Sequence, residues 1–445
     1  MTARAETIIA VATAPGRAGV AVLRVSGPEA GPLTVALTGR RPLPAPRLAA
    51  YASFSDPATG ALLDRGLLLW FPGPASFTGE DVAEFQVHGS RAVLAALLAA
   101  ATGFPGVRLA EPGEFTRRAF DNGKLDLTEV EGLADLIDAE TEAQRRQAVR
   151  QLDGALGQII LGWQARLMRA LAHCEATIDF VEEEDVPDDL LSATRPDLTA
   201  LLAEMRGQAA DGRGERLRQG LTIVILGPPN AGKSSLLNAL AGREAAIVSD
   251  RAGTTRDVIE LHLDLGGYPV TLVDTAGLRA TDDPIEAEGI RRARARADQA
   301  DLALVLLDRA DWPRVPDDVA PWLDQPGTLR LLTKCDAGIA PPADARGWLP
   351  LSVQDGIGFD ALMQALTERA AALLSTGADP LLTRARHRAA LDETCAALDR
   401  ALSGTLPELI TEDVRLALRG LGRIVGRVDV EDILGLIFAE FCIGK

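Results

Sequence analysis

The sequence holds one glycine-rich segment whose residue types and spacing suit phosphate binding. Residues 227–234 read GPPNAGKS, which fits the pattern GxxxxGK[ST]. Backbone amides of such a loop wrap phosphate groups, and the helix that follows adds a favourable potential at its N-terminus. Lys233 would reach the outer phosphates, and the Ser234 hydroxyl could bind magnesium. Because a fully apolar run precedes the loop and a helical pattern follows it, a chance glycine-rich turn is a poor alternative.

Two later segments suit magnesium and the terminal phosphate. An apolar strand candidate at 270–273 ends in DTAG, where Asp274 can hold magnesium through water and the Gly277 amide can sense the last phosphate. In GTTRD, residues 253–257, the second threonine, Thr255, could complete the magnesium shell. Ordinary loop hydrogen bonding is the alternative for these threonines, and the order of the segments argues against it.

A third segment, TKCD at 333–336, predicts the choice of base. The Asp336 carboxylate only accepts hydrogen bonds, so it suits the N1 and N2 donors of guanine and rejects adenine. Lys334 would lie along the base and ribose. G proteins usually have asparagine where Thr333 stands, so that amide contact is absent or replaced. Ser352 matches the loop that closes over guanine.

The hydrolytic machinery departs from that of Ras-like enzymes, which have glutamine after DTAG. Here Leu278 follows and cannot orient water. The amide oxygen of Asn230 is a good ligand for a monovalent cation, and the loop 247–254 is long enough to add carbonyls. Potassium there would supply the charge of an arginine finger. Glu286 could position the attacking water through a bridging water, or be a solvated surface carboxylate. The expected catalytic residues are Glu286, Asn230 and Lys233.

The elements that must position these residues fall into several domains, since 445 residues exceed one ordinary core. Residues 1–118 predict an α/β domain. Its expected elements are strands at 20–25, 66–71 and 82–88, a proline-rich loop at 39–57 and a helix at 91–101. In the third strand, Phe85 and Val87 should face one way and Glu84, Gln86 and His88 the other.

The rest of the chain predicts helices around an inserted G domain. Asp126 followed by Glu129 is typical of a helix start, one helix is expected from about 143 to 171, and another over 195–216. An acidic loop at 182–189 separates them. Alternating strands and helices from 221 to about 370 predict a doubly wound, mostly parallel sheet. The expected domains are 1–118, 119–216, 217–378 and 379–445, with both helical parts packed as one bundle.

Charge and cysteine content exclude some classes of protein. A formal net charge of −17 opposes general polyanion binding, so an RNA contact needs a local basic patch or a partner. The arginine-rich run at 291–296 could be such a patch, although it is more typical of a solvated helix face. Four scattered cysteines indicate neither disulfides nor zinc. Without a signal-peptide core or a membrane-spanning run, the cytoplasm is the expected location.

These motifs, together with blocks elsewhere, resemble the MnmE (TrmE) family of tRNA modification GTPases over the whole chain. The more specific blocks are APGRAG at 14–19, LRVSG at 23–27, FPGPASFTGEDVAEFQVHG at 71–89, RLAEPGEFTRRAF at 108–120, NGKLDLTEVEGLADLIDAET at 122–141 and FCIGK at 441–445. The P-loop itself is shared with many GTPases.

The resemblance implies an N-terminal domain that binds 5-formyltetrahydrofolate or a related reduced folate and forms a homodimer. It implies a helical domain interrupted by the G domain, and G domains that pair in a potassium-dependent way. It also implies an FAD-dependent MnmG (GidA) type partner, in a heterotetramer or larger assembly. Together they would add an aminomethyl or carboxymethylaminomethyl group to carbon 5 of the wobble uridine of certain tRNAs.

The resemblance also assigns residues. Arg24, Glu84, Lys124 and Lys445 match folate positions, and Cys442 matches the C-terminal cysteine. The potassium positions are Asn230, Ser249, Arg251 and Thr254, and the magnesium ligands are Ser234 and Thr255. The expected GTP-binding set is Gly227, Asn230, Ala231, Gly232, Lys233, Ser234, Ser235, Ser249, Thr254, Thr255, Asp274, Thr275, Ala276, Gly277, Thr333, Lys334, Asp336 and Ser352. The departures are Thr333 and Pro228, where arginine is common.

Two other functions fit parts of the sequence. A ribosome-assembly GTPase switch of the Era or Der type would share the G domain, but the N-terminal blocks and FCIGK argue against it. A stand-alone folate aminomethyltransferase would share the N-terminal blocks, but the inserted G domain argues against that. From the residues alone, the better interpretations are an exposed strand residue for Arg24, a solvated charge at a helix start for Lys124 and a frayed tail for FCIGK.

Overall fold

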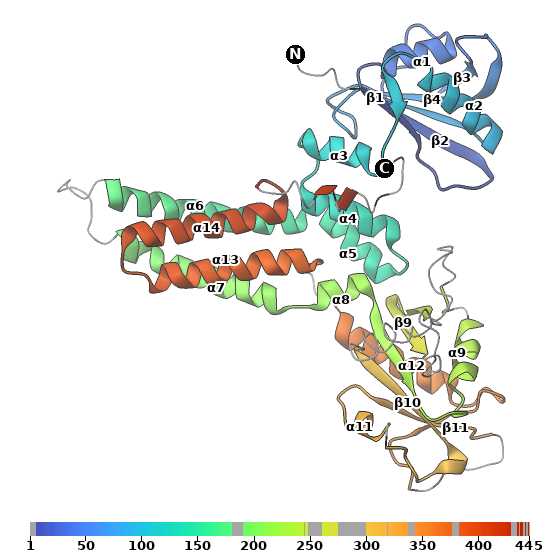
Figure 1. The fold of residues 1–445 in the computed structure, drawn as a ribbon, viewed down its shortest axis with the longest axis vertical. Helices are drawn as coiled ribbons and strands as arrows, with labels where there is room; N and C mark the ends of the chain where they lie inside the picture. Colours follow the sequence, from blue (N-terminus) through green and yellow to red (C-terminus); the bar gives the residue numbers. More distant parts are fainter. Residues whose placement is uncertain are drawn as a thin grey trace, which may run out of the picture. The chain divides into compact units, whose positions relative to one another are not determined.

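Figure 1 shows the fold of the computed structural model, which describes most of the chain. The chain divides into two compact units. The described residues are 6–179, 190–243, 245–247, 260–274, 300–317, 319–336, 342, 344–375, 382–428, 434–435, 437–438, 441 and 444. The first unit comprises Met1–Ala134, Gln151–Met168 and Arg415–Lys445. The second unit comprises Asp135–Arg150 and Arg169–Val414.

The first unit begins with a six-stranded sheet in the order β3-β4-β5-β2-β1-β6. Its strands are β1 Thr7–Val11, β2 Ala18–Ser26, β3 Ala50–Ser55, β4 Leu62–Phe71, β5 Val82–Gly89 and β6 Val107–Leu109, with helices α1 Ala30–Thr38 and α2 Arg91–Thr102. The alternation predicted for β5 is confirmed, because Phe85 and Val87 are buried whereas His88 is exposed. Apolar residues of the sheet and both helices form one core.

The loop predicted for residues 39–57 is partly wrong, because β3 lies within it. Ala52 and Phe54 are buried, whereas Tyr51 between them is exposed, so the strand has one core face and one solvent face. This strand pairs antiparallel with β4. The prolines that suggested a loop lie on either side of it: Pro42, Pro44 and Pro46 precede the strand and Pro57 follows it.

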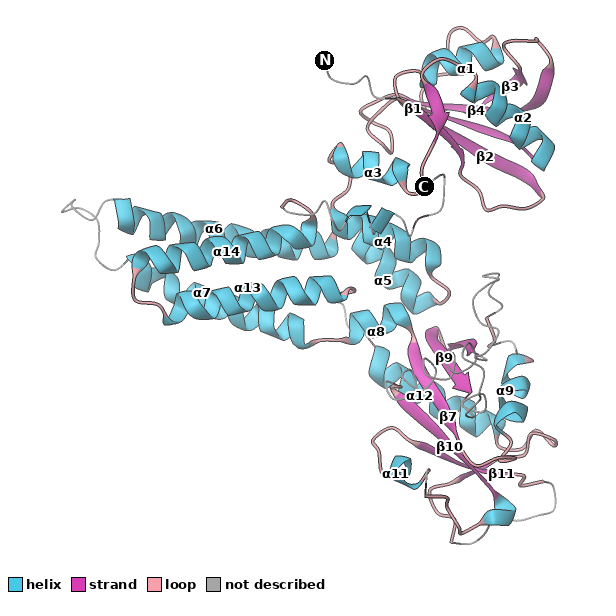
Figure 2. Cartoon of the chain, in the orientation of Figure 1, coloured by secondary structure: helices cyan, strands magenta, loops and turns pink. Residues whose placement is uncertain are grey.

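Helices dominate the middle and the end of the chain (Figure 2). They are α3 Glu114–Asp121, α4 Leu127–Asp138, α5 Glu142–Leu152, α6 Ala155–Asp179, α7 Leu190–Ala210, α8 Arg213–Gln219, α13 Ala385–Ser403 and α14 Pro407–Val425. The predicted helix start is confirmed: the Glu129 N–H donates to Asp126 Oδ1 at 2.9 Å, and the Asp126 N–H donates to Glu129 Oε2 at 2.6 Å. In the described part of the chain, no helix has the length and apolarity needed to cross a membrane.

Two helices differ from the prediction. The single helix expected from 143 to 171 is interrupted at Gly154, whose φ of 80° is left-handed and ends α5 before α6 begins. The helix expected over 195–216 ends at Ala210, and α8 follows as a separate helix. The helices before and after the insert nevertheless share a core in the second unit. There α7 packs against α13, and Cys174 packs against Ala401, Ile410 and Val414.

The G domain forms a second six-stranded sheet in the order β12-β11-β10-β7-β9-β8. Its strands are β7 Leu221–Leu226, β8 Glu260–Leu265, β9 Tyr268–Asp274, β10 Leu302–Asp308, β11 Leu329–Thr333 and β12 Leu349–Pro350. Its α-helices are α9 Lys233–Ala241, α11 Ala320–Leu323 and α12 Phe359–Leu374, with a short turn η2 at Arg309–Asp311. All strand pairs are parallel except β8 with β9, so the mostly parallel sheet predicted for this region is confirmed.

Candidate nucleotide-binding site

The topology of the G domain gathers the predicted motifs at one edge of its sheet. Strands β7, β9, β10, β11 and β12 are parallel neighbours, so their carboxyl ends meet there. The P-loop follows β7, Asp274 ends β9, Thr333 ends β11 and Ser352 follows β12. Strand β7 lies between β9 and β10, and such a switch point is where open α/β sheets bind ligands.

The P-loop has a backbone that its residue types allow. Gly227 has a φ of 153°, and a Cβ there would lie 2.5 Å from the carbonyl oxygen of Leu306, so only glycine fits. Gly232 has a φ of 92°, and Asn230 is a non-glycine residue at a φ of 65°. The loop leads directly into α9, whose first turn exposes Ser234 and Ser235.

Lys233 is held over the P-loop by the loop itself. Its Nζ donates to the carbonyl oxygens of Gly227 at 2.7 Å and Pro228 at 3.0 Å, and the residue is only 9% exposed. An ammonium fixed at the start of a helix, beside exposed hydroxyls, creates a local positive potential in an acidic protein. This part of the site can accept a phosphate group.

The Asp336 carboxylate, which is expected to recognise the base, is positioned by a buried hydroxyl. Ser352 is fully buried, and its Oγ donates to Asp336 Oδ1 at 2.7 Å while accepting from the Asp355 N–H at 3.1 Å. The Cys335 N–H also donates to the Leu351 carbonyl at 3.1 Å, which joins the two loops. Asp336 is therefore a fixed acceptor, as the discrimination of guanine from adenine requires.

Lys334 lies beside a second carboxylate at the same edge. Its backbone has a φ of 57°, and its Nζ is 2.5 Å from Asp308 Oδ2. Burial alone would raise the pKa of Asp308, but hydrogen bonds from Lys334 and from the Ala310 N–H outweigh it and hold the pKa below its usual value. The ion pair orients the stem of Lys334, which is half-exposed.

Thr333 joins the base-recognition loop to the P-loop. Its hydroxyl lies 2.9 Å from the carbonyl oxygen of Ala231 and 3.1 Å from that of Leu307, and the residue is 3% exposed. A hydroxyl has one proton to share between these two acceptors. Threonine at this position therefore still links the two loops, although it has no amide to offer the base.

In the N-terminal domain, the structure brings Arg24 and Glu84 together. They are paired in register on β2 and β5, and Arg24 Nε donates to Glu84 Oε1 at 2.9 Å. The Arg24 guanidinium also lies 5.5 Å from the ring centroid of Phe77 and 5.8 Å from that of Phe115. Both charged side chains stay partly exposed, so this aromatic-flanked pair remains accessible.

Lys124 and Gly444 contact other parts of the same domain. Lys124 Nζ donates to the carbonyl oxygen of Pro74 at 3.1 Å, in the loop that carries Phe77. A Cβ on Gly444 would lie only 2.1 Å from the carbonyl oxygen of Val11, so the end of the chain packs closely on β1. Val11 pairs with Leu23, the neighbour of Arg24.

The sequence analysis missed a charged network in the same domain as the Arg24–Glu84 pair. Arg118 contacts Glu80 at 2.9 Å and Glu114 at 3.0 Å, and Arg108 contacts Glu114 at 2.6 Å. Burial raises the pKa of Glu114, but hydrogen bonds from Arg108, the Glu111 N–H and Arg118 outweigh it and lower the pKa to about 2. The network stabilises the fold above the ordinary carboxyl pKa, and that contribution is lost as the pH falls towards 2. The spacing of Glu114 and Arg118, four residues apart on a helix, was the available signal.

Comparisons with known proteins agree with this geometry. Residues 127–442 match the family model described as the MnmE helical domain, and residues 7–124 match the one described as the GTP-binding protein TrmE N-terminus. The chain belongs to the MnmE family of tRNA modification GTPases. The resemblance predicted from the motifs is therefore confirmed.

Full-length relatives support the MnmE assignment. A tRNA modification GTPase MnmE of Parvibaculum lavamentivorans (strain DS-1) is 58% identical over 445 residues, covering 99% of this chain and 100% of the relative. Proteins of the same description from Rhodospirillum rubrum and Paramagnetospirillum magneticum are 54% and 55% identical, each covering 99% of this chain and 99% and 100% of the relative.

Several positions predicted from the motifs or from the MnmE resemblance lie outside the described residues. They are Ser249, Arg251, Thr254, Thr255, Thr275, Ala276, Gly277, Glu286, Cys442 and Lys445. The segments 182–189 and 291–296 also lie outside. Asp274 is described as the last residue of β9, paired with Ile225.

Replacing Thr333 with valine tests the link between the two loops in this MnmE-family chain. The variant keeps the shape but removes the hydroxyl, so the carbonyls of Ala231 and Leu307 lose their donor. We expect GDP affinity to fall about tenfold, in line with about 1–2 kcal/mol for one lost buried bond. Titration with a fluorescent GDP analogue measures it.

Thr328→Val is the matched control for this prediction. The Thr328 hydroxyl donates to the Trp322 carbonyl at 2.7 Å within the same domain, before the amino end of β11 and outside the motifs at its carboxyl end. Melting temperature should fall in both variants, whereas nucleotide affinity should fall only in Thr333→Val. Equal GDP affinities in the two variants would rule out the proposed role of Thr333.

Proposed function

We propose that this chain hydrolyses GTP at the edge of the G-domain sheet and uses hydrolysis in the modification of tRNA. With an FAD-dependent MnmG-type partner, it would add an aminomethyl or carboxymethylaminomethyl group to carbon 5 of the wobble uridine of certain tRNAs. The observation that carries the nucleotide part is Asp336, held by Ser352 at the sheet edge that also carries the P-loop lysine. Family membership supports the tRNA part.

The residues divide the work between phosphate and base. Lys233 neutralises charge on the outer phosphates, backbone amides of 227–234 bind their oxygens, and Asp336 accepts from guanine. The donors also suit magnesium, since the Ser234 hydroxyl is exposed at the start of α9 and Asp274 ends the neighbouring β9. With Thr255 these residues would hold the ion, which neutralises charge on the phosphates when bound.

A side chain of the P-loop suits a monovalent cation. Asn230 is exposed on the P-loop, and its side chain carries an amide oxygen suited to potassium. Ser249, Arg251 and Thr254 would complete that site, and Glu286 would help to orient the attacking water. Bound potassium supplies positive charge near the bond between the β- and γ-phosphates.

The N-terminal domain would bind 5-formyltetrahydrofolate or a related reduced folate. A folate presents N–H donors on its pterin ring and carboxylates on its glutamate tail. Glu84, oriented by its bond from Arg24, can accept from the former, and Lys124 and Lys445 can pair with the latter. The aromatic rings beside Arg24 add apolar surface against which a flat ring can pack. Cys442 precedes Lys445 in the same terminal motif.

The folate proposal predicts that Arg24→Ala combined with Glu84→Ala abolishes binding of 5-formyltetrahydrofolate and leaves GTP hydrolysis largely intact. The double variant removes both members of the ion pair, so no uncompensated charge remains. Isothermal titration calorimetry measures the binding. His88→Ala with Asp64→Ala is the matched control, since it removes a side-chain contact of 2.9 Å between His88 Nδ1 and Asp64 Oδ1 from the same sheet. Unchanged folate affinity in the first double variant would overturn the assignment.

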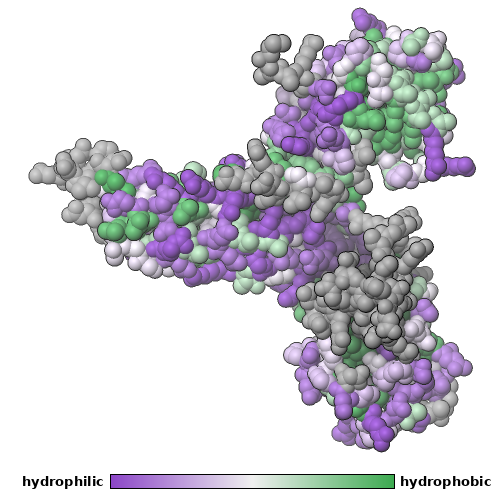
Figure 3. Space-filling view, viewed as in Figure 1, coloured by the Kyte–Doolittle hydropathy of each residue, from purple (hydrophilic) through white to green (hydrophobic). Residues whose placement is uncertain are grey.

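Exposed apolar side chains in the same domain support a homodimer. Leu48, Tyr51 and Leu62 are 60%, 66% and 52% exposed, in and beside strands β3 and β4. Figure 3 shows hydrophobic surface on this domain. Apolar surface of this kind is typical of a protein interface. We place the assembly with its MnmG-type partner in the cytoplasm, where tRNA is modified.

Nucleoside mass spectrometry tests the proposed function. In cells that lack this chain, the wobble uridines of its tRNA substrates should lose the added group, and expression of the wild-type chain should restore it. If the level of wobble-uridine modification is the same with and without this chain, the proposal is wrong. Loss of a ribosomal assembly step instead would favour a switch of the Era or Der type, although the match of residues 7–124 to the TrmE N-terminus favours tRNA modification.

A further inference from the structure

The β8–β9 hairpin connects the two sequence segments expected to sense the nucleotide. Its open end lies at the nucleotide edge, where Glu260 pairs with Val273 next to Asp274. By sequence, the segment with Thr255 precedes β8 and the segment with Gly277 follows β9. A displacement of either segment therefore moves the same hydrogen-bonded hairpin.

The turn of this hairpin, at the other end, contacts the helical segment. Gly266 and Gly267 form the turn with φ of 62° and 91°, and the Gly267 N–H donates to Asp264 Oδ1 at 2.6 Å. The Gly267 carbonyl accepts from the Ala143 N–H at 3.0 Å, at the N-terminus of α5. Ala143 also packs against the apolar core of the G domain. The turn and the first turn of α5 are thus directly joined.

Both chain connections to the G domain are bound by a single carboxylate of α4. Asp135 Oδ1 accepts from Arg218 Nε at 2.9 Å and from Arg384 Nη2 at 2.7 Å. Arg218 lies in the last turn of α8, immediately before β7, and Arg384 is the N-cap of α13, after the G domain. Asp135 and Arg384 are each only 13% exposed, so solvent screens this contact weakly.

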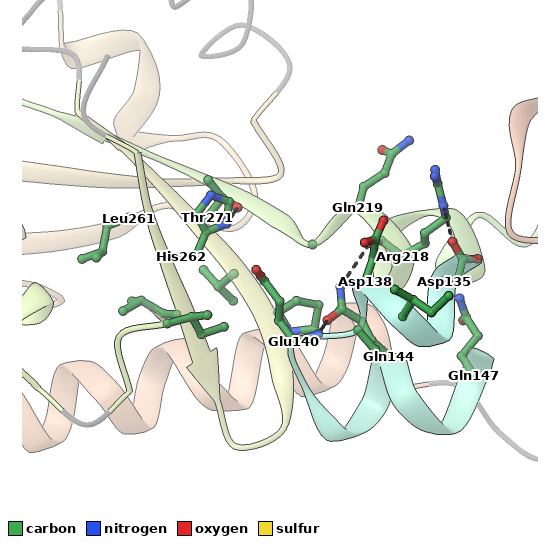
Figure 4. A pocket seen from close by; sticks show the side chains of 17 residues that line it. Asp135, Asp138, Glu140, Gln144, Gln147, Arg218, Gln219, Leu261, His262 and Thr271 are labelled. Atoms are coloured by element: carbon green, nitrogen blue, oxygen red, sulfur yellow. Dashed lines mark hydrogen bonds and ion pairs between the residues drawn. The ribbon is translucent and has the colours of Figure 1, made fainter. Parts of the chain in front are cut away.

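Helix α5 adds two amide contacts to the entering connection (Figure 4). Gln144 Nε2 donates to the Arg218 carbonyl at 3.1 Å, and Gln147 Nε2 donates to the Gly214 carbonyl at 3.1 Å. Residues 135–150 therefore contact the G domain at the hairpin turn and its two chain connections at α8 and at Arg384. We name them the joint segment.

A cavity of about 720 Å³ lies between the joint segment and the strands of the hairpin. Asp138 and Glu140 line one side, and His262 and Thr271, on β8 and β9, line the other. Close-packed interiors resist displacement, whereas a cavity leaves room for side chains to move. The strands of the hairpin that line the cavity can thus move relative to the joint segment without a steric clash.

We propose that the joint segment transmits the nucleotide state of the G domain to the helical domain, with Asp135 as the positioning residue. Asp135 fixes both chain connections, so movement of the hairpin displaces the N-terminus of α5 instead of rotating the whole G domain. Without that anchor, the two connections bend, the whole G domain rotates with the hairpin and the N-terminus of α5 is not displaced. The inference rests on the proposed nucleotide site and adds the route by which it acts.

Hydrogen–deuterium exchange of the full chain tests this route, with GDP compared against GDP plus aluminium fluoride. In the wild type, peptides covering 139–147 should change protection between the two states. In Asp135→Asn, which keeps the shape but removes the charge that two arginines share, this difference should be lost. Peptides covering 221–237 should be protected by nucleotide in both proteins, which shows separately that the nucleotide site works.

Asp413→Asn is the matched control, since Asp413 is 16% exposed and pairs with Arg400 at 2.8 Å between α14 and α13. It should keep the wild-type difference at 139–147. Arg218→Gln serves as a second test variant if Asp135→Asn does not fold. A wild-type difference that persists in a folded test variant would overturn the proposal, as would its absence from the wild type when 221–237 is protected. Failure of nucleotide to protect 221–237 would instead contradict the proposed function.

Discussion

Replacing Asp336 with asparagine is expected to weaken GTP binding about a hundredfold and to make xanthosine triphosphate the better ligand. The carboxylate accepts from both guanine donors, whereas an amide presents one acceptor and one donor. The donor of the amide then faces the guanine amino group but matches the xanthine carbonyl. Loss of about 3 kcal/mol, typical of hydrogen bonds to a charged group, corresponds to this factor. Competition binding against a fluorescent nucleotide measures both affinities.

Asp344→Asn is the control for the loss of one negative charge from the same domain. Its carboxylate accepts from Trp312 Nε1 at 3.0 Å and belongs to none of the nucleotide motifs. It should leave the preference for GTP over xanthosine triphosphate unchanged. Equal GTP affinity in Asp336→Asn and the wild type would show that guanine is recognised elsewhere.

GTP hydrolysis is expected to be at least about tenfold faster in potassium than in sodium, and Asn230→Ala should remove most of this difference. Leu278 cannot replace a catalytic glutamine, and the P-loop contains no arginine, so charge developing between the phosphates needs another positive partner. The exposed Asn230 can offer its amide oxygen to the larger ion, whereas sodium requires a tighter cage. Steady-state phosphate release at matched ionic strength measures the rates.

Asn238→Ala is the control for this experiment, because Asn238 is also exposed and lies on α9, beyond the P-loop. It should keep the full potassium effect. The stimulation of GTP hydrolysis by potassium should rise with protein concentration if G domains pair between dimers. It should stay constant if they pair within one dimer. Equal wild-type rates in potassium and sodium would contradict the cation mechanism and leave the GTPase assignment intact.

The sequence predicted which segments meet at one edge of the G-domain sheet, because each of them is a short run of consecutive residues after a strand. GPPNAGKS and TKCD each follow an apolar strand, and parallel strands bring their carboxyl ends together whatever the details of packing. The alternation in β5 predicted the face on which Glu84 lies, but Arg24 could be placed beside it only once β2 was known to pair with β5. Family resemblance, not periodicity, selected those two residues.

Contacts between distant segments could not be predicted in this way. The hydroxyl of Thr333 reaches a carbonyl 102 residues earlier in the chain, and Arg384 reaches Asp135 across 249 residues. No local pattern encodes such pairs, because tertiary packing chooses the partner. The prediction of one continuous helix across Gly154 was wrong for a related reason. An apolar repeat of three to four residues continues across the glycine even though the helix does not.

The most direct test of the central claim uses the altered nucleotide preference of Asp336→Asn. Purified chain, MnmG-type partner, substrate tRNA and the required donors are incubated with GTP or xanthosine triphosphate, and the wobble uridine is analysed by nucleoside mass spectrometry. We predict that the wild type modifies tRNA with GTP, and that Asp336→Asn does so with xanthosine triphosphate but not with GTP. Modification by the variant that proceeds equally with GTP, or without any nucleotide, would contradict the claim that hydrolysis at this site drives the reaction.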